Sequence, residues 1–206
     1  MSVLFALEII GTIAFAISGA IVGIREKMDL FGVAMLGMTT ATGGGVLRDL
    51  MLSITPPAVF QKPILAVIAI GVSFVLFFRP KDATEPKGTG KDKLLLLMDS
   101  IGLGLFTVLG VRTALETVAG ANAFLVSFIG VLTGVGGGLL RDLFAGKTPY
   151  IFVKHFYACA SIIGAWVCIL LWPKTGSFSA LLVGALLIVL LRLLAARYRW
   201  SLPKAV

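Results

Sequence analysis

Two short stretches, residues 43–50 and 136–143, share a pattern of three glycines, two apolar residues, arginine, aspartate and leucine. They lie 93 residues apart (43 to 136), each within a long apolar segment. A glycine in a helix interior costs about 1 kcal/mol relative to alanine, and a charge at the centre of a bilayer costs roughly 3 kcal/mol or more. A helix interrupted at the glycines would expose carbonyl oxygens, which bind cations, and N–H groups, which favour anions. The repeated motif therefore indicates a solute or ion path near the middle of a membrane.

Hydroxyl side chains stand before each glycine triplet and can replace part of the hydration shell of an ion. Small residues at four-residue spacing also favour simple helix packing, and this explanation remains open for the outlying glycines. For the two triplets we favour a break that lines a pore. The expected path-lining residues are Gly43, Gly44, Gly45, Gly136, Gly137, Gly138, Thr39, Thr40, Thr42 and Thr133.

Charged side chains within the apolar segments are expected to pair with each other. Glu8 and Arg48 lie at depths that match within about 2 Å, at a rise of about 1.5 Å per residue, and so do Asp99 and Arg141. We therefore expect the pairs Glu8–Arg48 and Asp99–Arg141. The competing partners are Asp49 and Asp142. Such pairs would either gate the two ends of a path or only hold the helices together, and the sequence favours neither.

The residue types needed for catalysis or metal binding are not grouped in this sequence. It has one histidine, no His-Glu-x-x-His pattern, and no serine or cysteine beside a plausible base. The sequence therefore predicts no enzyme, no cofactor and no metal site beyond a transient monovalent cation.

The elements that carry these residues are long apolar helices. Of the 206 residues, 58% are hydrophobic, and the mean hydropathy is +1.03. A membrane-spanning helix needs about 20 apolar residues. We predict an all-α polytopic membrane protein, one transmembrane domain over residues 1–206, whose second and fifth helices are broken at Gly-Gly-Gly. The seven predicted transmembrane helices are 3–24, 30–54, 63–78, 94–116, 121–145, 150–172 and 178–196.

The first six predicted helices form two copies of a three-helix unit. Glu8 and Phe15 match Asp99 and Phe106 at a spacing of 91 (8 to 99, 15 to 106). Repeat one covers 3–78, a polar linker covers 79–93, repeat two covers 94–172, and the extra helix is 178–196. Because three is odd, the second copy enters the membrane from the opposite side, which makes an inverted 3+3 repeat plus one.

The basic residues, which give a net charge of +8, are unevenly distributed between the predicted loops. Thirteen lysines and arginines fall on one side of the membrane and three on the other. The positive-inside rule then places the N-terminus outside and the C-terminus in the cytoplasm, and we expect a prokaryotic inner membrane. The basic residues are accordingly expected to contact membrane lipids rather than nucleic acid.

The duplicated motif and the three-plus-three-plus-one layout resemble the prokaryotic branch of the trimeric intracellular cation (TRIC) channel family, also labelled a glycine-transporter-domain family. The similarity covers about residues 4–197. It implies a homotrimer with one pore in each protomer, lined by kinked second and fifth helices at the two glycine triplets. It also implies conduction of monovalent cations, chiefly potassium, with sodium as a second candidate. Residues 39–42 depart from the Lys-Glu-Val signature that animal members carry near the first triplet, which leaves the gating signal open.

The alternative function is a secondary transporter for a small amino acid such as glycine. Inverted repeats and broken helices are typical of such carriers too, and a helix N-terminus with an arginine can hold a carboxylate. A hydrated path favours the channel, whereas a dry cavity sealed at one end favours the carrier.

Overall fold

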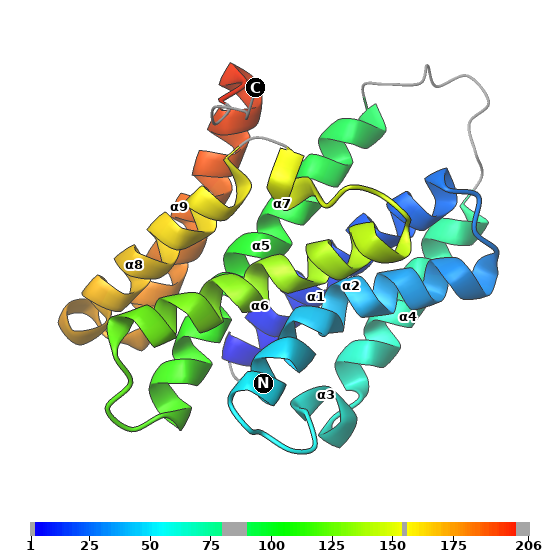
Figure 1. The fold of residues 1–206 in the computed structure, drawn as a ribbon. Coiled ribbons are helices and arrows are strands. Elements are labelled where there is room, and N and C mark those ends of the chain that lie inside the picture. Colours follow the sequence, from blue (N-terminus) through cyan, green and yellow to red (C-terminus); the bar gives the residue numbers. More distant parts are fainter. Residues whose placement is uncertain (1–2, 80–89, 154–155, 201–206) are drawn as a thin grey trace.

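The computed structural model describes residues 3–79, 90–153 and 156–200, and the regular elements in these ranges are helices. Figure 1 shows a single bundle in which α8 and α9 pack side by side on one flank, and α4 packs on α1 and α2 on the other. The helices are α1 (Val3–Arg25), α2 (Leu30–Met51), α3 (Ala58–Gln61), α4 (Ile64–Phe78), α5 (Gly90–Thr117), α6 (Ala123–Phe144), α7 (Tyr150–Val153), α8 (Tyr157–Thr175) and α9 (Ser177–Tyr198).

Within the described ranges, six helices are long and apolar enough to cross a membrane, namely α1, α2, α5, α6, α8 and α9. The third predicted membrane helix corresponds to α4, which has 15 residues and is about 22 Å long. A crossing by α4 therefore stays a prediction, because a full span needs about 20 residues. Most of the predicted linker, residues 80–89, lies outside the described residues, and α5 begins within its remaining part.

The sixth predicted membrane helix is divided in the structure. The short helix α7 (Tyr150–Val153) comes first, and α8 begins only at Tyr157. The first half has the same arrangement, because the short α3 precedes α4. Both short helices follow a helix that carries the Arg-Asp motif.

Corresponding helices of the two halves run antiparallel. In α1 and α5, Gly11 lies against the ring of Phe106, and Gly102 lies against the ring of Phe15. The two rings stack with their centroids 5.3 Å apart. An early residue of each helix thus contacts a later residue of its counterpart, which is the geometry of two halves inserted in opposite directions.

The predicted breaks at the glycine triplets are wrong. Helix α2 is continuous over Leu30–Met51 and α6 over Ala123–Phe144, and both triplets lie inside them. Every residue of both triplets is helical, so the helical backbone continues through the glycines. The triplets instead allow α2 and α6 to cross in close contact. A Cβ on Gly44 would overlap the carbonyl oxygen of Thr133, and one on Gly137 would overlap that of Thr40.

Candidate functional site

Two cavities lie on either side of the crossing of α2 and α6. The Glu8 cavity, of about 400 Å³, lies between the start of α1, the C-terminal half of α2, α3 and α4, and the C-terminal half of α5. The Asp99 cavity, of about 340 Å³, lies between the end of α1, the start of α5, the end of α6 and Arg192 of α9. Glu8 and Val22 line different cavities and stand 14 residues apart on α1 (8 to 22), about 21 Å. The cavities therefore face opposite ends of the bundle.

The predicted hydroxyls are spread along α2 and α6, and the deepest ones are used within their own helices. Thr40 donates to the Leu36 carbonyl at 2.6 Å, and Thr133 donates to the Ile129 carbonyl at 2.6 Å. Both threonines are fully buried at the crossing. Their hydroxyl protons are thus occupied, while their oxygen lone pairs remain available as acceptors.

The outer members of the predicted set have different surroundings. Thr42, which donates to the Met38 carbonyl at 2.9 Å, lines the Glu8 cavity together with Gly45. Gly138 lies near the Tyr157 hydroxyl and Asp99. The remaining residues pack in the helix interfaces or beside them: Gly43 against Leu140, Gly136 against Leu47, and Thr39, which is half-buried on α2.

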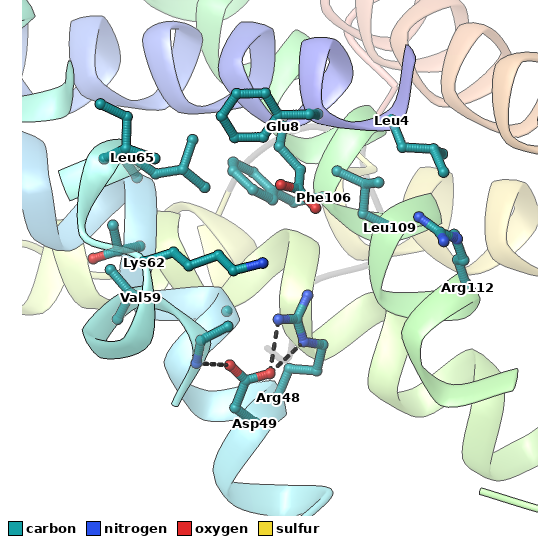
Figure 2. Close-up of a pocket in the computed structure, with 16 residues that line it drawn as sticks. Leu4, Glu8, Arg48, Asp49, Val59, Lys62, Leu65, Phe106, Leu109 and Arg112 are labelled. Atoms are coloured by element: carbon teal, nitrogen blue, oxygen red, sulfur yellow. Dashed lines mark hydrogen bonds and ion pairs between the residues drawn. The ribbon is translucent and has the colours of Figure 1, made fainter. Parts of the chain in front are cut away.

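Arg48 pairs with the adjacent Asp49 rather than with Glu8. Its Nε and Nη2 atoms lie 2.8 and 2.7 Å from the same Asp49 oxygen. The other Asp49 oxygen accepts from the backbone N–H of Ala58 at 2.8 Å (Figure 2). The predicted Glu8–Arg48 pair is wrong, because the neighbouring carboxylate is already fixed by Ala58 and captures the guanidinium. None of the basic side chains in the described ranges lies within ion-pair distance of Glu8, whose carboxylate points into the cavity.

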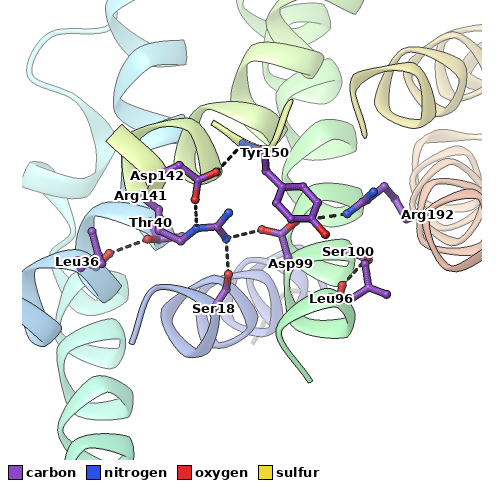
Figure 3. A network of polar contacts seen from close by, with 10 residues as sticks. All are labelled: Ser18, Leu36, Thr40, Leu96, Asp99, Ser100, Arg141, Asp142, Tyr150 and Arg192. Carbon is purple, nitrogen blue, oxygen red and sulfur yellow. Dashed lines mark hydrogen bonds and ion pairs between the residues drawn. The ribbon is translucent and has the colours of Figure 1, made fainter. Parts of the chain in front are cut away.

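Arg141 is the centre of a buried network in the other cavity (Figure 3). Its Nη1 lies 2.6 Å from Asp99, so the expected Asp99–Arg141 pair is present. Its Nε donates to Asp142 at 2.8 Å, and Nη1 also donates to the Ser18 hydroxyl. The second Asp142 oxygen accepts from the backbone N–H of Tyr150 at 2.7 Å.

The two Arg-Asp motifs therefore make the same contacts in both halves. Each aspartate binds its neighbouring arginine with one oxygen and the first backbone N–H of the following short helix with the other. This arrangement neutralises the arginine beside a cavity and fixes the chain as it leaves α2 or α6. Hydrogen bonds to an ionised carboxylate are among the stronger ones in proteins.

Comparison with known proteins shows which family has this architecture. A family model described as Glycine transporter matches residues 5–81 and 96–173, one match in each half. A UPF0126 membrane protein of Deinococcus radiodurans is 38% identical over 96% of this chain and 89% of its own length. The UPF0126 inner membrane protein YadS of Escherichia coli K12 is 35% identical over 96% and 93%.

Among solved structures, the TRIC trimeric intracellular cation channel orthologue from Rhodobacter sphaeroides is 33% identical, with a TM-score of 0.87. The alignment covers 97% of this chain and 100% of that chain. This chain belongs to the prokaryotic TRIC family. Within this TRIC fold, the two cavities lie on opposite sides of the α2–α6 crossing.

In this TRIC-family chain Arg192 also belongs to the network, although the sequence indicated it only as one of the basic residues near the C-terminal end. Arg192 is fully buried, and its Nη2 lies 3.9 Å from the second oxygen of Asp99. Its guanidinium carbon lies 4.5 Å from the ring centroid of Tyr157 and 5.5 Å from that of Tyr150. The available signal was its position within an apolar run, residues 181–196, where a charge needs a buried partner.

Proposed function

We propose that this protein is a channel for monovalent cations, chiefly potassium, with one path through each protomer of a homotrimer. The path runs from the Glu8 cavity, past the crossing of α2 and α6, to the Asp99 cavity. The observation that carries the proposal is the presence of two charged cavities on opposite sides of one glycine crossing. The solved structure of a trimeric intracellular cation channel orthologue with the same fold supports both conduction and the trimer.

The ion pairs of the two motifs make this path compatible with cations. An unpaired arginine beside the path would repel them. Arg48 is paired with Asp49, and Arg141 is paired with both Asp99 and Asp142. Each cavity wall therefore holds a carboxylate beyond the one needed to neutralise its motif arginine, namely Glu8 or Asp99.

The crossing itself is the narrowest part of the proposed path. Because Gly44 and Gly137 have no side chains, the Thr40 and Thr133 carbonyls come against the facing helix. Carbonyl and hydroxyl oxygens can take over the hydration shell of a monovalent cation. Since the helices are in close contact there, a small separation of α2 and α6 would open the path, and we propose the two glycine triplets and the neighbouring threonines as its lining.

One observation favours a second candidate, a carrier for a small amino acid such as glycine. The Glu8 cavity combines a carboxylate that forms no ion pair with the described side chains and the basic side chains Lys62 and Arg112. These groups are complementary to the ammonium and carboxylate of a zwitterion. The close crossing also separates the two cavities, as alternating access requires.

We further propose that the protein lies in a prokaryotic inner membrane in contact with its lipids, with the N-terminus outside and the C-terminus in the cytoplasm. The related E. coli protein is named an inner membrane protein, which supports this location. The orientation rests on the distribution of basic residues.

Potassium current through the purified protein in a planar bilayer tests the channel against the carrier. We expect discrete openings, with rates far above the turnover of a carrier. A Thr42→Cys variant in a Cys159→Ser background should lose this current on reaction with a charged thiol reagent, because Thr42 lines the Glu8 cavity whereas Cys168 is buried. The Cys159→Ser parent is the control and should be unaffected. No current from the parent, together with saturable glycine uptake into liposomes, would reject the channel in favour of the carrier.

A further inference from the structure

Helix α9 stands outside the repeat and adds a single charge to the middle of the Asp99 network. Arg192 has no exposed surface, approaches Asp99 to 3.9 Å and lies over the rings of Tyr157 and Tyr150. A guanidinium stacked against aromatic rings has a fixed position. The charge of Arg192 is therefore a permanent part of this cavity wall.

The repeated residues give the two cavities one corresponding set of charged groups each. Glu8, Arg48 and Asp49 correspond to Asp99, Arg141 and Asp142 at spacings of 91 and 93 (8 to 99, 48 to 141, 49 to 142). Each set contains two carboxylates and one guanidinium, so each carries one net negative charge. Among the helices described in the first half, α1 to α4 in residues 3–79, none corresponds to α9.

Arg192 cancels the negative charge of this set in the Asp99 cavity. The other charged side chains of that lining are paired, Arg25 with Asp92 and Lys147 with Glu26. The basic groups nearest to Glu8 on the other side are of a different kind. Lys62 is exposed, and Arg112 forms a partly exposed pair with Glu116. They are accordingly more strongly screened by water and salt than a fully buried guanidinium. The two cavities thus differ in how firmly their extra carboxylate is neutralised.

We propose that Arg192 keeps monovalent cations from binding at Asp99, so that the Asp99 cavity is a weakly occupied part of the path and Glu8 is its cation-attracting group. This inference rests on the proposed channel function and assigns the control of cation occupancy to the helix outside the repeat. Arg192 acts through Asp99, because its positive charge offsets the negative charge of that carboxylate.

Removing the charge should turn the Asp99 cavity into a cation site. In Arg192→Gln, the melting temperature of the detergent-solubilised protein should rise with potassium chloride, but not with N-methylglucamine chloride at the same ionic strength. The wild type should show a much smaller difference between the two salts. The double variant Arg192→Gln/Asp99→Asn should lose the difference again, because it removes both members of the pair.

Potassium conduction gives a second measurement of the effect of Arg192. One unit charge at about 5 Å in water changes the occupancy of a monovalent cation by about fourfold. We expect potassium current that enters from the Asp99 side to rise by about fourfold in Arg192→Gln, and current from the opposite side to rise less. Arg192→Lys retains the charge and should behave like wild type. Arg197→Gln removes the same charge from an exposed site on the same helix and is the matched control.

The thermal measurement separates this inference from the channel proposal, because it does not require conduction. The absence of a potassium-specific shift in Arg192→Gln would overturn the role of Arg192 even if the wild type conducts. If Arg192→Gln does not fold, the Asp99→Asn variant tests the inference in its place. This variant leaves a net positive cavity, so its potassium current should fall about fourfold, and a current equal to that of the wild type would overturn the inference.

Discussion

At the scale of single residues, the Arg-Asp motif is a self-neutralising unit that also caps the next helix. Each aspartate uses one oxygen for its arginine and one for a backbone N–H. Arginine can therefore lie beside a cavity within the membrane without contributing an uncompensated charge. The arginine of the second half is buried more deeply, since the Arg141 side chain is 3% exposed and that of Arg48 is 15% exposed, whereas both aspartates are buried.

We predict that Asp142→Asn destabilises the protein by about 3–5 kcal/mol, the usual cost of removing one partner of a buried ion pair. The variant leaves Arg141 with only Asp99 for its charge and weakens the contact to Tyr150. The free energy of unfolding in mixed detergent measures the loss.

Glu116→Gln is the control for Asp142→Asn, because it breaks the Arg112–Glu116 pair, in which Glu116 is 51% exposed. Its expected cost is at most about 1 kcal/mol. Equal losses for the two variants would show that the buried motif is not structurally important.

At the scale of elements, the glycine triplets are contact surfaces between two continuous helices. The middle glycine of each triplet faces the backbone of the partner helix, whereas Gly45 has free space on its Cβ side and lines the Glu8 cavity. Adjacent residues of one triplet therefore have different surroundings, a helix contact for Gly44 and a cavity for Gly45.

Gly44→Ala should lower the stability of the protein by about 1–3 kcal/mol or more, because the new methyl group overlaps the Thr133 carbonyl and must separate α2 from α6. Gly45→Ala is the matched control one residue away. Its methyl group has room, and the higher helix propensity of alanine should stabilise α2 by up to about 1 kcal/mol. Detergent unfolding of the two variants checks this, and a similar loss in both would contradict close packing at Gly44.

The short helix α4 determines on which side of the membrane the chain ends. With six long helices and a crossing by α4, the number of crossings is seven, and the two termini lie on opposite sides. We expect an N-terminal tag to be accessible from outside the cell and a C-terminal fluorescent protein to fold in the cytoplasm. Finding both termini on the same side would show that α4 does not cross.

At the scale of the whole molecule, the protein has one end built around Glu8 and another around Asp99, joined at the crossing. The antiparallel halves produce two similar cavities, and α9 makes them unequal. A resting protein with this close crossing should not connect its two cavities.

Access from the two sides of the membrane tests this separation. In a Cys159→Ser background, Thr42→Cys should react with a membrane-impermeant thiol reagent from one side, and Leu96→Cys should react from the other, because these residues line different cavities. Labelling in oriented vesicles, with the Cys159→Ser parent as control, measures this. Reaction of either cysteine from both sides would reveal a continuous path at rest.

The sequence by itself determined the all-α apolar architecture, the two related halves and the Asp99–Arg141 pair. Apolar length, motif spacing and depth along a helix are local quantities, and they can be counted along the chain. The partner of Arg48 could not be predicted from such counts, because it depends on which carboxylate the fold immobilises. The backbone N–H of Ala58 immobilises Asp49.

Only the tertiary structure decided how the glycine triplets and Arg192 are used. A glycine triplet is compatible with a break or with a close helix contact, and the choice depends on the facing helix, 93 residues away (44 to 137). Likewise, a basic residue near the end of an apolar helix is compatible with the membrane surface or with a buried partner. The packing of α9 on α5 and α8 brings Arg192 to Asp99, and no local pattern encodes that distance.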